Sequence, residues 1–164
     1  MATLFIVRHA IAEERGPKYP KDELRPLTSE GRSRMKAVTA GFRTLEPELD
    51  LILTSPLVRA ETTAKILQSG LKGETPIEIF TELEPGNAPE DVAVALGRFK
   101  SAKSIALVGH EPDLGQLAAW LIGAEEAIEF KKGGICRIDV AGLPPRQRGK
   151  LIWHATPRML RALA

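Results

Sequence analysis

The sequence predicts an α/β fold: a three-layer α/β/α sandwich around a mostly parallel central sheet, with an antiparallel edge. Short apolar segments typical of buried strands alternate with segments whose apolar residues recur every three or four positions, as in helices. The last two strand-like segments follow one another with no helix between them, which favours an antiparallel pair. The chain has 164 residues and no internal repeat or low-complexity linker, so we expect a single domain spanning residues 1–164.

In the first half of the chain, two buried strands are expected, at 3–7 ("TLFIV") and 51–54 ("LILT"), each followed by a helix. The first helix is expected to run from Thr28, as its N-cap, to about residue 45. The second is expected to begin at Ser55-Pro56, with serine as the cap and proline at the first helical position. Their predicted apolar faces are Met35, Val38, Phe42 and Leu45, and Leu57, Ala60, Ala64 and Leu67.

The second half continues the alternation and then departs from it. We expect strands at 77–80, 104–109, 134–140 and 150–155 and helices at 89–100 and 112–122. The helix at 89–100 begins with Pro89, Glu90 and Asp91, and acidic residues suit the positive end of a helix dipole. The final segment, "PRMLRALA", alternates basic and apolar residues like a short docked helix, with too little apolar area for a membrane anchor.

The composition narrows the range of functions. Only 5% of residues are aromatic and the formal net charge is +2, which disfavours nucleic-acid binding. A single cysteine cannot form an internal disulfide and fits a reducing compartment. The N-terminal apolar run of residues 4–7 is too short for a signal peptide or a membrane span, so we expect a cytoplasmic protein. No CxxC or HExxH motif is present, and we expect no metal, no cofactor and a monomer.

Three of the expected strands end in residues that can bind an anion. The segments are "VRHA" after the first strand, "TSPLVRAETT" after the second and "VGHEP" after the strand at 104–109. Ligands of parallel α/β sheets bind beyond the carboxyl ends of the strands, and those ends share one edge. We therefore expect four side chains to converge there: Arg8, His9, Arg59 and His110.

These residue types suit a phosphoryl group. Arg59 falls in the first turn of its helix, where side chains lean back towards a terminus that already favours anions. A planar guanidinium can hold two phosphoryl oxygens at once. A neutral imidazole can carry a phosphoryl group covalently, provided that one ring nitrogen stays free while the other is tied, usually to a backbone carbonyl.

Together the motifs "RHA", "SPLVRAETT" and "VGHEP" resemble the histidine phosphatase superfamily, which has the phosphoglycerate mutase-like fold. The segment "DELRPLTSEGR" and the lack of room for a large inserted cap resemble its SixA-type phosphohistidine phosphatases. The resemblance extends from Leu4 to about Trp153. The superfamily's first motif is usually Arg-His-Gly, whereas Ala10 stands at the third position here, where glycine would allow either sign of φ.

The resemblance implies a role for each of the four residues. His9 would be the nucleophile that becomes phosphohistidine, Arg8 and Arg59 would bind the phosphoryl oxygens, and His110 would hydrogen-bond the phosphoryl group. Glu82, in "FTELEPG", is the candidate general acid for the leaving group. The alternative is that a leaving imidazole is protonated by solvent or before transfer.

The sequence therefore predicts a metal-independent phosphatase whose substrate is phosphohistidine on a protein. A protein substrate is expected because a small-molecule enzyme would need a cap to exclude water. A phosphatase of small phosphate esters and a non-catalytic phosphate-binding module remain the alternatives. Outside the predicted site, we interpret His154 and Cys136 as structural residues. The basic residues Arg146, Arg148 and Lys150 are expected to form a solvated edge hairpin.

Overall fold

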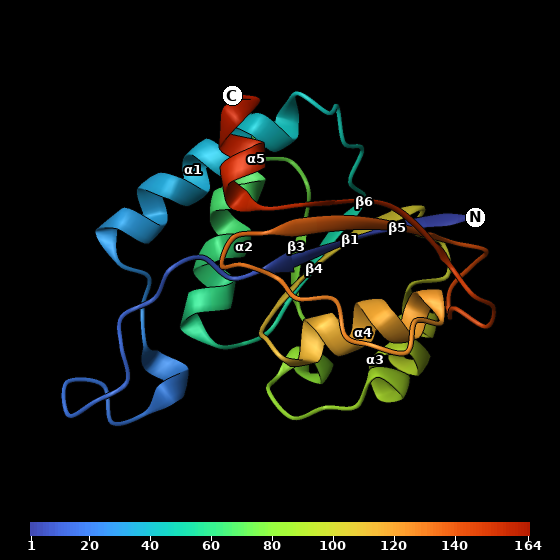
Figure 1. The fold of residues 1–164 in the computed structure, drawn as a ribbon, viewed down its shortest axis with the longest axis horizontal. Helices are drawn as coiled ribbons and strands as arrows, with labels where there is room; N and C mark the ends of the chain where they lie inside the picture. Colours follow the sequence, from blue (N-terminus) through green and yellow to red (C-terminus); the bar gives the residue numbers. More distant parts are fainter.

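A computed structural model describes all residues, 1–164, and contains one six-stranded sheet with helices on both faces (Figure 1). The strands are β1 (Ala2–Arg8), β2 (Leu51–Thr54), β3 (Ile77–Ile79), β4 (Ser104–Gly109), β5 (Ile135–Val140) and β6 (Lys150–Ala155). The α-helices are α1 (Ser29–Arg43), α2 (Val58–Gly70), α3 (Pro89–Ala95), α4 (Asp113–Ile122) and α5 (Pro157–Ala162). Short 3-10 helices are η1 (Asp22–Leu24), η2 (Thr81–Leu83) and η3 (Leu96–Phe99).

The strand order confirms the predicted fold class. The sheet runs β3-β2-β4-β1-β5-β6, and the four strands β1 to β4 are mutually parallel. β5 is antiparallel to β1 and to the edge strand β6. The antiparallel pair lies at one edge of the sheet, as predicted from the two final strand-like segments.

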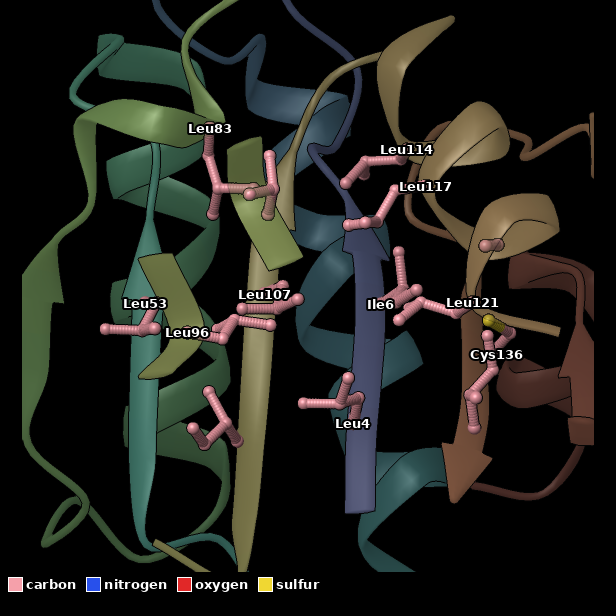
Figure 2. Packing of buried hydrophobic residues seen from close by; sticks show 14 of the residues in the cluster. Leu4, Ile6, Leu53, Leu83, Leu96, Leu107, Leu114, Leu117, Leu121 and Cys136 are labelled. Carbon is pink, nitrogen blue, oxygen red and sulfur yellow. The ribbon is translucent and has the colours of Figure 1, made fainter. Parts of the chain in front are cut away.

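Both faces of the sheet are covered, which explains why β1 shows no polar alternation. Leu4 and Ile6 lie in a core cluster with residues of α3 and α4, and Figure 2 shows Ile6 beside Leu121 of α4. Phe5 and Val7 lie in a second cluster with residues of α1, α2 and α5. A strand buried on both sides must be apolar at every central position.

No helix is both long and apolar enough to cross a membrane.

The two helices that flank the site begin differently. The Thr28 hydroxyl accepts a hydrogen bond from the Gly31 N–H at 2.8 Å, which confirms Thr28 as the N-cap of α1. The prediction for the second helix was wrong by two residues, since Leu57 is the N-cap and α2 begins at Val58. The Ser55 hydroxyl instead accepts from the Leu57 N–H at 3.3 Å within the turn that precedes the helix.

Three smaller predictions also need correction. Leu45 lies beyond the end of α1 and is 44% exposed, so it does not belong to the buried helix face. The predicted helix at 89–100 is divided into α3 and η3. Phe80 follows β3 and leads into η2. The C-terminal segment does form a docked helix, since Leu160 of α5 is fully buried in the cluster that contains residues of α1.

Candidate active site

The carboxyl ends of β1, β2 and β4 meet at one edge of the sheet. The register pairs Arg8, the last residue of β1, with Gly109, the last residue of β4, and the end of β2 lies one position short of that level. The residues that follow these strands, His9, Ser55 and His110, therefore lie together. The ring centroids of the two histidines are 5.3 Å apart.

His9 is held in one tautomer by the backbone. Its Nδ1 lies 2.7 Å from the carbonyl oxygen of Ala10, and a carbonyl can only accept, so Nδ1 carries the proton. In the neutral ring, Nε2 then keeps its lone pair. The Ala10 N–H donates to the Thr63 hydroxyl at 3.0 Å, which fixes the backbone beside His9 to α2. Ala10 does not have a positive φ, so its methyl group causes no backbone strain at the position where glycine is usual.

His110 is tied to the end of β2. Its Nε2 lies 2.8 Å from the Ser55 hydroxyl, and both side chains are buried. Its Nδ1 is buried without a hydrogen-bond partner in the protein. A serine hydroxyl that donates to Nε2 leaves the proton on Nδ1, which makes Nδ1 a donor for an oxyanion.

Burial and the neighbouring cations keep both imidazoles neutral. Burial lowers the pKa of His9 to about 4; the Ala10 hydrogen bond opposes this shift, and the charges of Arg59 and Arg8 add to it. Burial lowers the pKa of His110 to about 3, and the nearby charges of His9 and Arg59 act in the same direction. The basic form of each ring, which has a free lone pair, therefore persists well below neutral pH.

We expect both histidines to titrate far below the usual pKa of about 6.5. Nitrogen NMR of labelled protein should show His9 and His110 neutral down to about pH 5, with His9 gaining its proton near pH 4. The His9→Ala and His110→Ala variants assign the two signals. A His9 ring that protonates between pH 6 and 7 would contradict the burial described above.

Arg59 is the second residue of α2 and is held by the loop that follows β1. It is 3% exposed, and its Nη1 and Nη2 donate to the carbonyl oxygen and the carboxylate of Asp22, at 2.9 and 3.1 Å. Asp22 also accepts from the Arg25 guanidinium at 2.8 Å. Partial burial alone would raise the pKa of Asp22, but the hydrogen bonds from Arg25 and Arg59 outweigh it, and the pKa lies below its usual value.

Arg8 is held in a similar way on the other side of His9. Its Nη1 donates to the backbone carbonyl of Phe130 at 2.7 Å, in the loop between α4 and β5. Each arginine thus has part of its guanidinium fixed by a loop residue. A guanidinium has five N–H groups, so donors remain on both side chains for a ligand.

The remaining donors identify the kind of ligand that the site suits. The Nε atoms of Arg8 and Arg59 and the Nδ1 of His110 are all buried without a partner in the protein. Buried nitrogen donors without an acceptor are rare and costly. Two guanidinium groups and an imidazole N–H around a neutral His9 form an environment that favours a multiply charged oxyanion such as a phosphoryl group.

Glu82 lies at the periphery of this cluster. It belongs to η2 and lines a small cavity together with His110. Its carboxylate forms an ion pair with the Arg98 guanidinium at 2.8 Å. Its role as a general acid stays a prediction.

The sequence reasoning missed four residues that position the site. Arg59 is held by Asp22, and His110 is held by Ser55. The backbone of Ala10 is held by Thr63, and Arg8 is held by Phe130. A usable signal existed for three of them, because Asp22 begins the segment "DELRPLTSEGR" and Ser55 and Thr63 lie in the motif "TSPLVRAETT".

The residues interpreted as structural, His154 and Cys136, form no hydrogen bond with the four predicted site residues. Cys136 is fully buried in the core, and burial raises its thiol pKa to about 12. The His154 ring packs on the Phe130 ring with centroids 4.9 Å apart. The basic residues of the edge hairpin, Arg146, Arg148 and Lys150, are exposed, as predicted. No group of three or more His, Cys, Asp or Glu side chains is placed to hold a metal ion.

Comparison with known proteins shows what this arrangement is similar to. The family model for the histidine phosphatase superfamily (branch 1) matches residues 4–86, which include Arg8, His9 and Arg59. An uncharacterized protein of Picosynechococcus is 37% identical over 163 residues, covering 96% of this chain and 98% of that protein. The phosphohistidine phosphatase SixA of Escherichia coli is 26% identical over 156 residues, covering 94% of this chain and 93% of that protein.

Solved structures agree with the sequence comparison. The structure of the protein histidine phosphatase SixA complexed with tungstate has a TM-score of 0.84 and 25% identity to this chain. The match covers 95% of this chain and 97% of that chain.

Proposed function

The chain belongs to the histidine phosphatase superfamily, and on that premise we propose that it is a metal-independent phosphatase that removes the phosphoryl group from phosphohistidine on a protein. The superfamily and the likeness to SixA support phosphatase activity. The protein substrate, the covalent intermediate and the residue roles are the proposal. The observation that carries it is the neutral His9, whose Nδ1 is tied to the Ala10 carbonyl and whose ring lies close enough to Arg59 and Arg8 for their charges to lower its pKa.

The proposed reaction has two phosphoryl transfers. In the first, the lone pair of His9 Nε2 attacks phosphorus, a new P–N bond forms, and the P–N bond to the substrate imidazole breaks. The leaving nitrogen takes up a proton. In the second, water attacks phosphorus and loses a proton, a P–O bond forms as the P–N bond to His9 breaks, and inorganic phosphate leaves His9 with its Nε2 lone pair restored. Arg8, Arg59 and His110 stabilise the charge on the phosphoryl oxygens in both transfers.

The surroundings of the site support a large substrate. The connections over this edge of the sheet hold only the short helices η1 and η2, with no domain-sized insertion to cover the site. An open depression of about 480 Å³ lies beside Asp22, with Leu57 and Glu84 in its lining. Because Asp22 also contacts Arg59, a side chain that projects from a folded partner would approach the site over this depression.

The contacts of the two nearby carboxylates support a P–N bond as the one that breaks. Asp22, which contacts Arg59, has a pKa below its usual value and is therefore ionised at neutral pH. Glu82 is engaged in an ion pair with Arg98. A leaving alkoxide needs a proton from an acid, whereas a leaving imidazole accepts one from water near neutral pH.

The test of this function is a side-by-side assay with a matched variant. We expect wild-type protein to hydrolyse a phosphohistidine-bearing protein with at least about tenfold higher kcat/KM than any of a panel of small phosphate esters. Glu82→Gln should leave phosphohistidine hydrolysis within about twofold and should lower ester hydrolysis if Glu82 supplies the proton there. A clear preference for one small ester would favour the small-molecule phosphatase, and phosphate binding with no hydrolysis of any substrate would favour a binding module.

A further inference from the structure

We propose that Glu111 is a positioning residue for Arg8, acting through the backbone of Phe130. The proposal rests on the proposed function, because it assigns a role to a residue that sets the geometry of the phosphoryl site. Glu111 directly follows His110, yet its carboxylate contacts neither histidine. Its oxygens accept hydrogen bonds from the Gly115 N–H at 2.7 Å and the Phe130 N–H at 3.3 Å.

Phe130 connects this carboxylate to the phosphoryl site. Its N–H donates to Glu111 and its carbonyl oxygen accepts from Arg8 Nη1 at 2.7 Å, so both polar groups of one buried backbone residue are engaged. A residue held at its N–H cannot rotate freely about its backbone. The Glu111 contact therefore determines the direction of the carbonyl that Arg8 meets, and thus which N–H groups of Arg8 face the ligand.

A second tether keeps the loop in place when the first is removed. The Ile128 N–H donates to the carbonyl of Gly115 in α4 at 3.0 Å. The approach is so close that a Cβ on Gly115 would lie 2.2 Å from the Ile128 carbonyl oxygen. Loss of the Glu111 carboxylate should therefore leave residues 123–134 docked on α4 and change the orientation of residue 130 locally.

The charges of nearby carboxylates act on the Arg8 guanidinium in addition to these hydrogen bonds. Burial raises the pKa of Glu111, and the two backbone N–H donors and the charge of Arg8 oppose that rise. The Arg8 side chain also experiences the charge of Glu129, which lies in the same loop, is exposed, and makes no hydrogen bond to residue 130. The chain therefore offers a matched pair of carboxylates near Arg8, one with the backbone contact and one without it.

The experiment compares Glu111→Gln with Glu129→Gln. An amide has one acceptor oxygen, so Gln at 111 can accept one of the two N–H groups and must present its own donor to the other. We expect Glu111→Gln to lower kcat/KM on the phosphohistidine protein about tenfold or more, and Glu129→Gln to stay within about twofold. Small misplacements of a positioning group have effects of this size. Equal losses in the two variants would assign the effect to charge alone and overturn the proposal.

A double-mutant cycle with Arg8→Lys separates positioning from general destabilisation. If Glu111 acts through Arg8, Glu111→Gln should cost less than about threefold in the Arg8→Lys background. A full tenfold loss in that background would contradict the proposal. The affinity for inorganic phosphate, measured by calorimetry, should weaken in Glu111→Gln and not in Glu129→Gln. Because that affinity does not depend on turnover, it still tests Glu111 when wild-type protein fails to hydrolyse phosphohistidine, an outcome that would refute only the proposed function.

Discussion

Replacing His9 with alanine is expected to reduce phosphatase turnover below detection while phosphate binding is largely retained. The ring supplies the only proposed nucleophile, and Nε2 of the other imidazole in the site, His110, is engaged by Ser55. The arginines that would bind the phosphoryl oxygens do not contact the His9 side chain by a hydrogen bond and remain in place. Turnover and calorimetric phosphate affinity measure the two effects separately.

The control for this variant is Lys36→Ala, which removes an exposed side chain on α1 away from the phosphoryl cluster. It should retain most of the activity. Rapid acid-free quenching with radiolabelled substrate should trap a labelled phosphohistidine in wild-type protein and none in His9→Ala. Near-normal turnover in His9→Ala, or label on another residue, would remove His9 as the nucleophile.

Replacing Arg59 with lysine is expected to lower kcat/KM by roughly a hundred- to thousand-fold. Loss of one preorganised donor at a developing charge typically costs about 3–4 kcal/mol. Lysine keeps the charge but has a single donor head on a flexible stem, so it cannot replace the hydrogen bonds to Asp22 and offer further N–H groups at once. The melting temperature of the variant must show that it is folded.

Arg34→Lys is the matched surface control, since Arg34 is half-exposed on α1 and pairs only with Glu30. It should stay within about twofold of wild type. A rate for Arg59→Lys within about threefold of wild type would exclude Arg59 from phosphoryl binding. The idea that three strand ends converge on one anion would then lose its support at the end of β2.

The fold could be predicted from the sequence because its main determinants are local. The buried strands carry continuous apolar runs, and Thr28 has the side chain that caps α1. The start of α2 could not be predicted in the same way. Ser55 has the residue type of a helix cap, but its hydroxyl contacts His110, which is 55 residues away, as well as the turn before the helix. The local sequence does not show whether the serine hydroxyl will cap the helix or bind a residue far away in the chain.

The same distinction applies to the site. Arg8, His9, Arg59 and His110 could be predicted to meet because each lies at or just beyond a strand end, and parallel strands bring those ends to one edge. The contact of Asp22 with Arg59 could not be predicted, because it spans 37 residues and depends on how the segment after β1 folds back. The contact between Arg8 and Phe130 uses a backbone carbonyl, which every residue possesses. Such contacts depend on the tertiary structure, and the residue type does not predict them.

The pairing of Asp22 with Arg59 has a consequence for how the cycle would end. Its carboxylate lies against the same guanidinium that would bind a phosphoryl group, and two anions beside one cation repel each other. Inorganic phosphate, once formed, would therefore meet a guanidinium whose charge is already partly compensated. Phosphate dissociation would be favoured, and free phosphate in solution would compete less well for the site. A counter-charge that holds an arginine in position would thus also limit product inhibition.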